Sequence, residues 1–371
     1  MILGVPTDSK LGFINARSRR AAVKLDSVKR RQLVHNATTL GVGALTLGEP
    51  LVALLGDSEP TPIPARVGAT DIEQIRTATR EFQEWGGTYG GGLVREPAMA
   101  QLRWSARLLD EAACPERLRP ELHSAVGHLA TTTGFLTEEI NAQEEARRVY
   151  GFGLTCAERA QDWPLRAEIL SSMTKQAIRT GRPDDGLTLA EQALVRSDRL
   201  TAAGRSLLHT DRGRALAKMR RVNETLTAIG TADEHFTHFT PDNEPPVMAY
   251  YSAARHAHLT GQPLVDLAIL GHDPGEATDR LTAAVAEHPN THTVAQAICL
   301  TKLAGLTMVT GDPLQAAAFG HAALDTAGTI RSWRVAEELR ELSRYAVPHQ
   351  HLDEVAHLRH RIATLVCTDR P

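Results

Sequence analysis

The sequence predicts an all-α fold, a solenoid of stacked helical hairpins, and three observations predict it. Alanine and leucine, two of the strongest helix formers, are abundant, while the 371 residues include only 7 Phe, 5 Tyr and 4 Trp. After residue 70, segments with helical apolar periodicity alternate with Gly, Pro and Asp. The motif Thr-Gly-x-Pro recurs at 180–183, 260–263 and 310–313, where we expect one helix to turn into the next.

The spacing of these turns predicts a repeat of about forty residues. Corners are expected at 141, 181, 221, 272 and 311, so the intervals are 40, 40, 51 and 39 residues, and the long interval contains the Pro-rich loop 239–246. Asp312 and Pro313 form a typical helix start, in which the aspartate caps the amide of Gln315. Stacked hairpins bury their apolar faces against one another and leave the first helix of each hairpin on a concave surface.

Composition divides the chain into three regions. Residues 1–27 form a basic amino-terminal segment, 28–68 an apolar strap with a Pro-rich linker, and 69–366 the repeat domain. The first forty residues carry eight Lys or Arg against two Asp, a net charge of +6, in a chain whose net charge is -3. A basic end on an acidic body fits either nucleic-acid contact or a solvated linker. The candidate nucleic-acid contacts are Arg17, Arg19, Arg20, Lys24, Lys29, Arg30 and Arg31.

Export and membrane insertion are not favoured by the strap. Arg30 and Arg31 precede the apolar stretch 40–48, as in a twin-arginine signal, but Glu49 and Pro50 interrupt the stretch before it could span a membrane. The four cysteines lie far apart without a C-x-x-C pair, which argues against a disulfide framework. We therefore expect a cytoplasmic protein without a membrane partner.

Patterns typical of catalysis or cofactor binding are weak. The glycine-rich segment 85–92 lacks the Lys-Ser/Thr of a phosphate-binding loop and is interpreted as a corner between helices. His357 and His360 have i,i+3 spacing rather than the H-E-x-x-H frame of zinc proteases. The carboxylate pairs 138–139 and 337–338 are interpreted as solvated helix faces. The sequence thus predicts no enzyme, no cofactor and no metal site.

With these corners in place, the sequence resembles the tetratricopeptide-repeat proteins, whose small-residue sites match alanines of the second helices. That resemblance implies a right-handed superhelix. Residues 13–365 further resemble the sensory region of actinobacterial Cro/C1-type (XRE-type) helix-turn-helix transcriptional regulators. Three patterns carry this likeness: Val28-Lys-Arg-Arg-Gln-Leu-Val34 with its Gly/Ala/Leu continuation, Glu84-Trp-Gly-Gly-Thr-Tyr-Gly-Gly-Gly92, and the Thr-Gly-x-Pro repeats.

In those regulators a DNA-binding domain precedes the strap, and the last helix of that domain often ends with a sequence similar to residues 3–13. Only the end of that domain is present here, so we expect either that the start codon is misplaced or that the gene has lost its DNA-binding helices. DNA is then a partner only through an upstream helix-turn-helix domain, or weakly through the basic segment. The sequence does not determine the oligomeric state, and a homodimer is one of the states that we leave open.

The resulting functional hypothesis is a sensory or interaction module that binds a peptide, a small ligand or a protein on its concave surface. The alternative is a DNA-independent protein-protein scaffold. A basic lining would favour an acidic peptide or its carboxylate terminus. Helical phase selects seven candidate ligand-binding residues: Lys175, Arg179, Arg212, Tyr250, Tyr251, Arg255 and Lys302.

Overall fold

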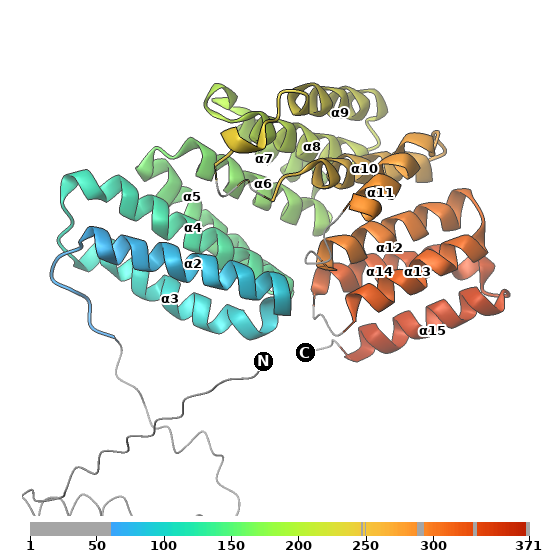
Figure 1. Cartoon of the computed structure of the whole chain (residues 1–371), viewed down its shortest axis with the longest axis horizontal. Coiled ribbons are helices and arrows are strands. Elements are labelled where there is room, and N and C mark those ends of the chain that lie inside the picture. The colour runs from blue at the N-terminus through green and yellow to red at the C-terminus, as the bar shows by residue number, and fades with distance from the viewer. Residues whose placement is uncertain (1–60, 246–247, 249, 288–292, 329–331, 369–371) are drawn as a thin grey trace, which may run out of the picture. The chain divides into compact units, whose positions relative to one another are not determined.

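The computed structural model describes residues 61–371 except 246–247, 249, 288–292, 329–331 and 369–371 (Figure 1). Within these ranges the chain is all-helical, which confirms the predicted class. The α-helices are α2 (Ala69–Tyr89), α3 (Gly91–Glu111), α4 (Arg119–Glu139), α5 (Gln143–Ala160), α6 (Trp163–Arg179), α7 (Pro183–Leu194), α8 (Ala202–Lys218), α9 (Val222–Phe236), α10 (Ala253–Ile269), α11 (Gly275–Glu287), α12 (Thr293–Thr310), α13 (Pro313–Ala327), α14 (Trp333–Tyr345) and α15 (Asp353–Thr368).

The predicted basic segment and apolar strap lie outside the described residues, apart from the end of the linker. Residues 65–67 pair with Ala113, because Val67 N–H donates to Ala113 O and Ala113 N–H donates to Ala65 O, each at 3.0 Å. Val67 is 1% exposed and packs in the core formed by α2, α3 and α4. This end of the linker therefore belongs to the folded unit.

The turns between paired helices fall where the repeat predicts them. Asn141, Gly181 and Gly271 have φ values of 63°, 77° and 99° between α4 and α5, α6 and α7, and α10 and α11. The α8–α9 turn contains Arg220 with φ 61°, and Gly311 separates α12 from α13. Left-handed residues let the chain reverse immediately after a helix. These five corners are confirmed to within one residue.

The corner predicted at 260–263 is wrong, because these residues lie inside α10. Thr260 Oγ1 donates to the carbonyl of His256 one turn earlier, at 2.7 Å. Gly261 packs against Leu281 of α11, where a Cβ would lie 3.2 Å from a methyl carbon. Tertiary packing thus keeps the helix continuous through Pro263, although proline disfavours helix interiors.

Two other local predictions are refined by the structure. The glycine-rich segment is a corner, but it is reduced to Gly90 with φ 83°, while Trp85 to Tyr89 continue α2. Asp312 caps α13 by accepting the N–H of Leu314 at 2.9 Å, one residue earlier than expected.

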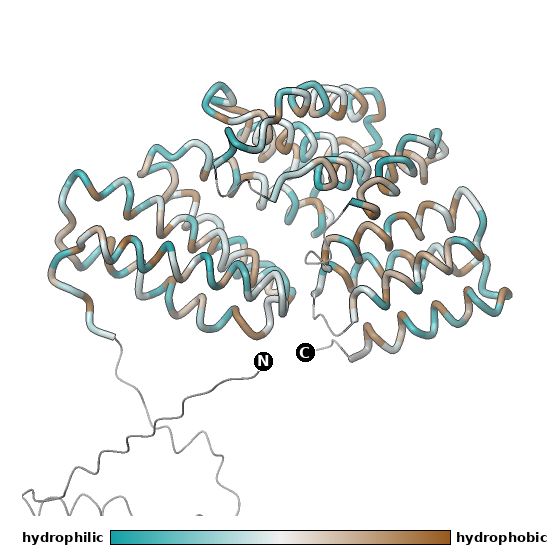
Figure 2. The backbone as a smooth tube through the Cα atoms, viewed as in Figure 1, coloured by the Kyte–Doolittle hydropathy of each residue, from teal (hydrophilic) through white to brown (hydrophobic). Residues whose placement is uncertain are grey.

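Small residues allow the helices of each hairpin to approach closely. Figure 2 shows hydrophobic and hydrophilic residues interspersed along the helices, and the buried positions include many alanines. On α4, Gly127 faces Leu165 and Gly134 faces Tyr150 at distances that would not admit a Cβ without rearrangement. The composition, rich in Ala and poor in aromatics, is consistent with this packing.

The even-numbered helices contact one another in chain order. Helices α4, α6, α8, α10, α12 and α14 each contact the next one, and α14 also contacts α4. The odd-numbered helices from α5 to α11 pack against the even-numbered ones on either side in the chain, whereas α13 packs against α12 and α15. The even-numbered helices therefore share an inner face, which holds the candidate site.

Among the described helices, α12 has the length and apolarity of a membrane span. Over half of its 18 residues are buried, and it contacts α10, α11, α13 and α14. These contacts are typical of a core helix.

Candidate ligand-binding cavity

A cavity of about 380 Å³ opens between the inner faces of α2, α4, α6, α10 and α14. This volume lies in the usual range for small-ligand sites. The lining includes charged, hydroxyl and aromatic side chains: Phe82, Gln83, Thr131, Thr132, Phe135, Glu138, Tyr150, Glu168, Ser171, Ser172, Lys175, Arg179, Tyr250, Arg255 and Arg334.

Four of the seven candidates selected by helical phase line this cavity: Lys175, Arg179, Tyr250 and Arg255. Lys302 lines a neighbouring cavity of about 180 Å³, which Arg179 and Arg334 share with the first. There Lys302 Nζ contacts Glu338 at 2.6 Å and Glu341 at 2.9 Å.

The other two candidates point elsewhere. Arg212 pairs with Glu191 of α7 at 3.5 Å. Arg212 lies two positions before Arg214, which lines the smaller cavity, so the two side chains are more than half a helical turn apart and point in different directions. Tyr251 is 1% exposed and its hydroxyl bonds to Ser206 at 3.0 Å, in the core beside α8. Helical phase predicted that both side chains lie on the inner face, and the structure shows that this prediction is wrong.

The carboxylates of Glu138 and Glu139 are buried rather than solvated, which corrects the sequence interpretation. Their residues are 2% and 4% exposed. Glu138 accepts hydrogen bonds from Arg179 Nε at 2.8 Å and from the Tyr150 hydroxyl at 3.2 Å. Glu139 pairs with Arg334. Arginines from α6 and α14 supply the charge that makes burial of two adjacent glutamates tolerable.

Lys175 and Arg255 are the cavity cations without a carboxylate partner. Within the described part of the chain, neither has an anionic group within 4.0 Å. The Arg255 guanidinium lies 5.8 Å from the centre of the Tyr250 ring, and its Nε is buried without a hydrogen-bond partner. Burial lowers the pKa of both cations. An anion entering the cavity would supply the missing partner for both.

Glu168 is the cavity carboxylate that lacks a bound arginine. Burial raises its pKa to about 7, against the opposing influence of Lys175. Its Oε2 is buried without a hydrogen bond and lies 3.8 Å from His128 Nδ1. Near neutral pH this side chain is therefore partly protonated, which reduces the negative charge in the cavity.

The remaining walls combine aromatic rings with hydroxyl groups. Phe82, Phe135 and Tyr250 provide apolar surface. The Oγ1 of Thr132 is buried and has no hydrogen-bond partner, whereas Ser171 Oγ is bonded to Asp211 at 2.5 Å. This arrangement suits a ligand with one anionic group and an apolar body.

A hydrogen-bond chain, buried at Ser206 and His256 and partly exposed at Asp233, joins three residues that sequence reasoning did not connect. Ser206 Oγ lies 3.2 Å from His256 Nδ1, and His256 Nε2 lies 2.8 Å from Asp233 Oδ1. The residue types are those of a hydrolase triad, but Ser206 is fully buried and its hydroxyl donates to Ala232 O at 2.8 Å. Arg280 also binds Asp233, so the chain links α8, α9, α10 and α11. Its contacts are those of a structural network.

Sequence reasoning also missed Phe135, Glu168 and Arg334. Glu168 lies one turn before Ser172 and two turns before Lys175 on α6, so its phase could have identified it. Arg334 reaches the cavity through the contact between α14 and α4, for which no local sequence signal exists.

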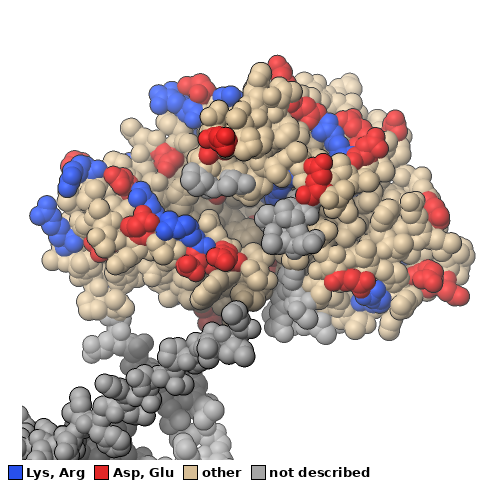
Figure 3. Space-filling view, in the orientation of Figure 1, with Lys and Arg blue, Asp and Glu red and all other residues tan. Residues whose placement is uncertain are grey.

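The predicted nucleic-acid contacts at Arg17, Arg19, Arg20, Lys24, Lys29, Arg30 and Arg31 lie outside the described residues. On the face in Figure 3, Lys and Arg lie beside Asp and Glu without gathering into a patch of one sign.

No protein-family model matches the chain, and no curated protein is significantly similar to it.

Proposed function

We propose that the chain is the sensory module of a cytoplasmic regulatory protein and that its cavity binds an anionic ligand, such as the carboxylate end of a peptide. The hairpins α2–α3 to α14–α15 would form a tetratricopeptide-like solenoid whose concave face is this cavity. The forty-residue spacing and the succession of contacts between even-numbered helices support that arrangement.

The observation that carries the proposal is the pair of cations without a carboxylate partner, Lys175 and Arg255, beside aromatic walls. Burying a cation without a partner is costly, and proteins accept that cost mainly where a ligand repays it. The ligand would bring α6 and α10 together through one anionic group. Because α14 contacts α4 beside the cavity, the module could adopt two forms that differ in the spacing of the helices around the cavity. A ligand that binds one of these forms more tightly would shift the equilibrium toward it. In a regulator carrying a helix-turn-helix domain, that shift would be the signal.

The test uses 1-anilinonaphthalene-8-sulfonate, a fluorescent probe with one anionic group and an aromatic body. We expect saturable binding by the full chain, weakened at least tenfold by the double substitution Lys175→Gln/Arg255→Gln, because each charged contact contributes about 1.5–3 kcal/mol. Arg212→Gln is the matched control, since it removes a cation of α8 that is paired with Glu191 outside the cavity. Circular dichroism checks that each variant is folded.

A pool of short peptides with free carboxyl termini is expected to displace the probe, and the same pool with amidated termini is not. Equal probe affinity in the wild type and the double variant would refute the proposed site.

A protein-protein scaffold is the second candidate, and one exposed surface favours it. Trp85, Tyr89 and Leu93 are 46%, 59% and 72% exposed around the α2–α3 corner, where Gly92 approaches Ile140, the exposed residue that follows α4. Exposed aromatic clusters are typical of protein interfaces. If the cavity binds no anion but Leu93→Asp abolishes capture of a partner, the scaffold is the better description.

A further inference from the structure

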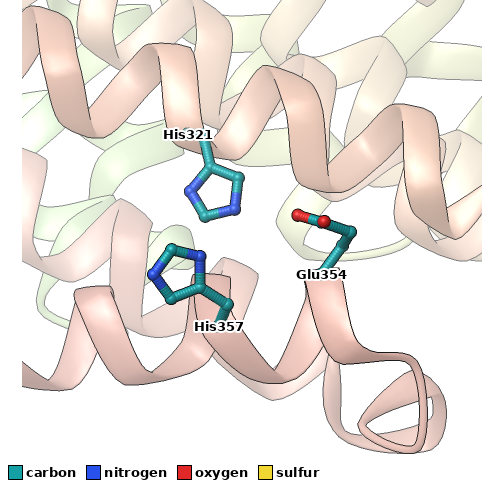
Figure 4. Close-up of side chains that lie close together, drawn as sticks. All are labelled: His321, Glu354 and His357. Carbon is teal, nitrogen blue, oxygen red and sulfur yellow. The ribbon is translucent and has the colours of Figure 1, made fainter.

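The last hairpins bring together two histidines and a glutamate that are far from the cavity. His321 comes from α13, and Glu354 and His357 come from α15 (Figure 4). One possible ligand atom from each of these residues lies within 4.8 Å of the other two. Glu354 and His357 are separated by three positions, so they share a face of α15, and α15 packs against α13.

The three side chains of the cluster differ in what a metal would have to displace. His321 Nε2 is buried without a hydrogen-bond partner and faces the Glu354 carboxylate (Figure 4). Among the described residues, neither Glu354 nor His357 has an ion-pair partner.

We propose that His321, Glu354 and His357 bind a zinc ion that joins α13 to α15. Two imidazoles and one carboxylate form a common zinc donor set, with water completing a tetrahedral site. Imidazole ligands favour zinc over magnesium or calcium, which prefer oxygen donors. This site is independent of the cavity and of the function proposed for it.

Arg361 is expected to compete with the metal. Its NH1 donates to His321 Nδ1 at 3.0 Å and its NH2 donates to Asp325 at 2.6 Å. An Nδ1 that accepts a hydrogen bond leaves the ring proton on Nε2, which is the nitrogen facing Glu354. Zinc binding at Nε2 therefore requires the proton to move to Nδ1, and Arg361 to keep its bond to Asp325 alone.

The experiment is calorimetric titration of Zn²⁺ into the full chain after treatment with a chelator. We expect one equivalent to bind, at least a tenfold loss of affinity in His321→Ala and in Glu354→Gln, and tighter binding in Arg361→Met. The matched control is His360→Ala, because His360 is an exposed histidine on the same helix outside the cluster. It should bind zinc as the wild type does.

Thermal unfolding provides a second measurement. Zinc should raise the melting temperature of the wild type and of His360→Ala, but not that of His321→Ala, because only a bound metal stabilises the folded state. Glu354 is exposed, so Glu354→Gln remains informative if His321→Ala fails to fold. Wild-type affinity in Glu354→Gln, or no zinc binding by the wild type, would overturn the proposal.

Discussion

At the scale of single residues, Glu168 makes the cavity sensitive to pH. Its folded-state pKa of about 7 lies above its ordinary value of 4.5, so folding takes up a proton between these two pH values. The stability that this group contributes is complete below pH 4.5 and is lost as the pH rises through 7. The same ionisation adds a negative charge beside Lys175 and Arg255, where the proposed anion binds.

We therefore predict that affinity for the anionic probe falls roughly three- to tenfold between pH 6 and pH 8, and that Glu168→Gln removes most of this dependence. Fluorescence titrations at several pH values measure it. Lys175 also has a lowered pKa, and loss of its proton would act in the same direction at higher pH. Glu168→Gln isolates the part due to the carboxyl group. A variant that retains the full dependence would assign it to Lys175 instead.

Helical phase placed Lys175, Arg179 and Arg255 at the cavity, but it misplaced Arg212, although α8 is as long as α6. It was insufficient for Tyr251, which precedes the start of α10, where the periodicity of a helix does not apply. It also misplaced Glu138 and Glu139 in solvent. Charge alone suggests exposure, and only the arginines of α6 and α14 explain their burial.

At the scale of elements, the contact between α4 and α5 depends on the absence of a side chain at Gly134. A Cβ there would lie 2.6 Å from a ring carbon of Tyr150, which is 1% exposed. The neighbouring Gly151 on α5 has no atom within 4 Å of the same position. The two glycines therefore differ in packing although both lie in helices.

This difference predicts opposite effects of one substitution. Gly134→Ala should lower the free energy of unfolding by about 1–3 kcal/mol through overpacking. Gly151→Ala should raise it by about 0.5–1 kcal/mol, because alanine favours the helix. Urea unfolding of both variants measures the effects. A destabilised Gly151→Ala variant would show that α5 has contacts on that side.

The sequence specified the order of helices and turns because glycine, asparagine, aspartate and proline act locally. The corner predicted at 260–263 shows that such local signals are not always sufficient. The motif is the same as at 180–183 and 310–313, but the packing of Gly261 against α11 decides the outcome. Motifs of four residues contain no information about the helix that lies beside them.

At the scale of the whole described unit, Arg334 joins α14 to α4. Its guanidinium pairs with the buried Glu139 and lies 4.7 Å from the centre of the Phe135 ring. An open stack of repeats unfolds as a sum of neighbouring units and frays from its ends. Contact between α4 and α14 couples the stability of distant hairpins.

Arg334→Met should lower the free energy of unfolding by about 3–5 kcal/mol, because it leaves the carboxylate of Glu139 buried and unpaired. Hydrogen exchange should show that α4 and α14 lose protection together, while α8 and α9 change little. Glu139→Gln/Arg334→Met should recover part of the loss. Lost protection in α14 alone would mean that the two helices are not coupled.

The contact between Glu139 and Arg334 also sets the order in which the cavity is built during synthesis. These partners are 195 residues apart in the chain. At typical rates of translation, α4 therefore waits roughly 10–40 s for the arginine that neutralises Glu139. The nascent hairpins can pack in sequence as they leave the ribosome, but the cavity is completed only when α14 emerges. The proposed ligand would therefore find all of the residues that line this cavity only after Arg334 has been made.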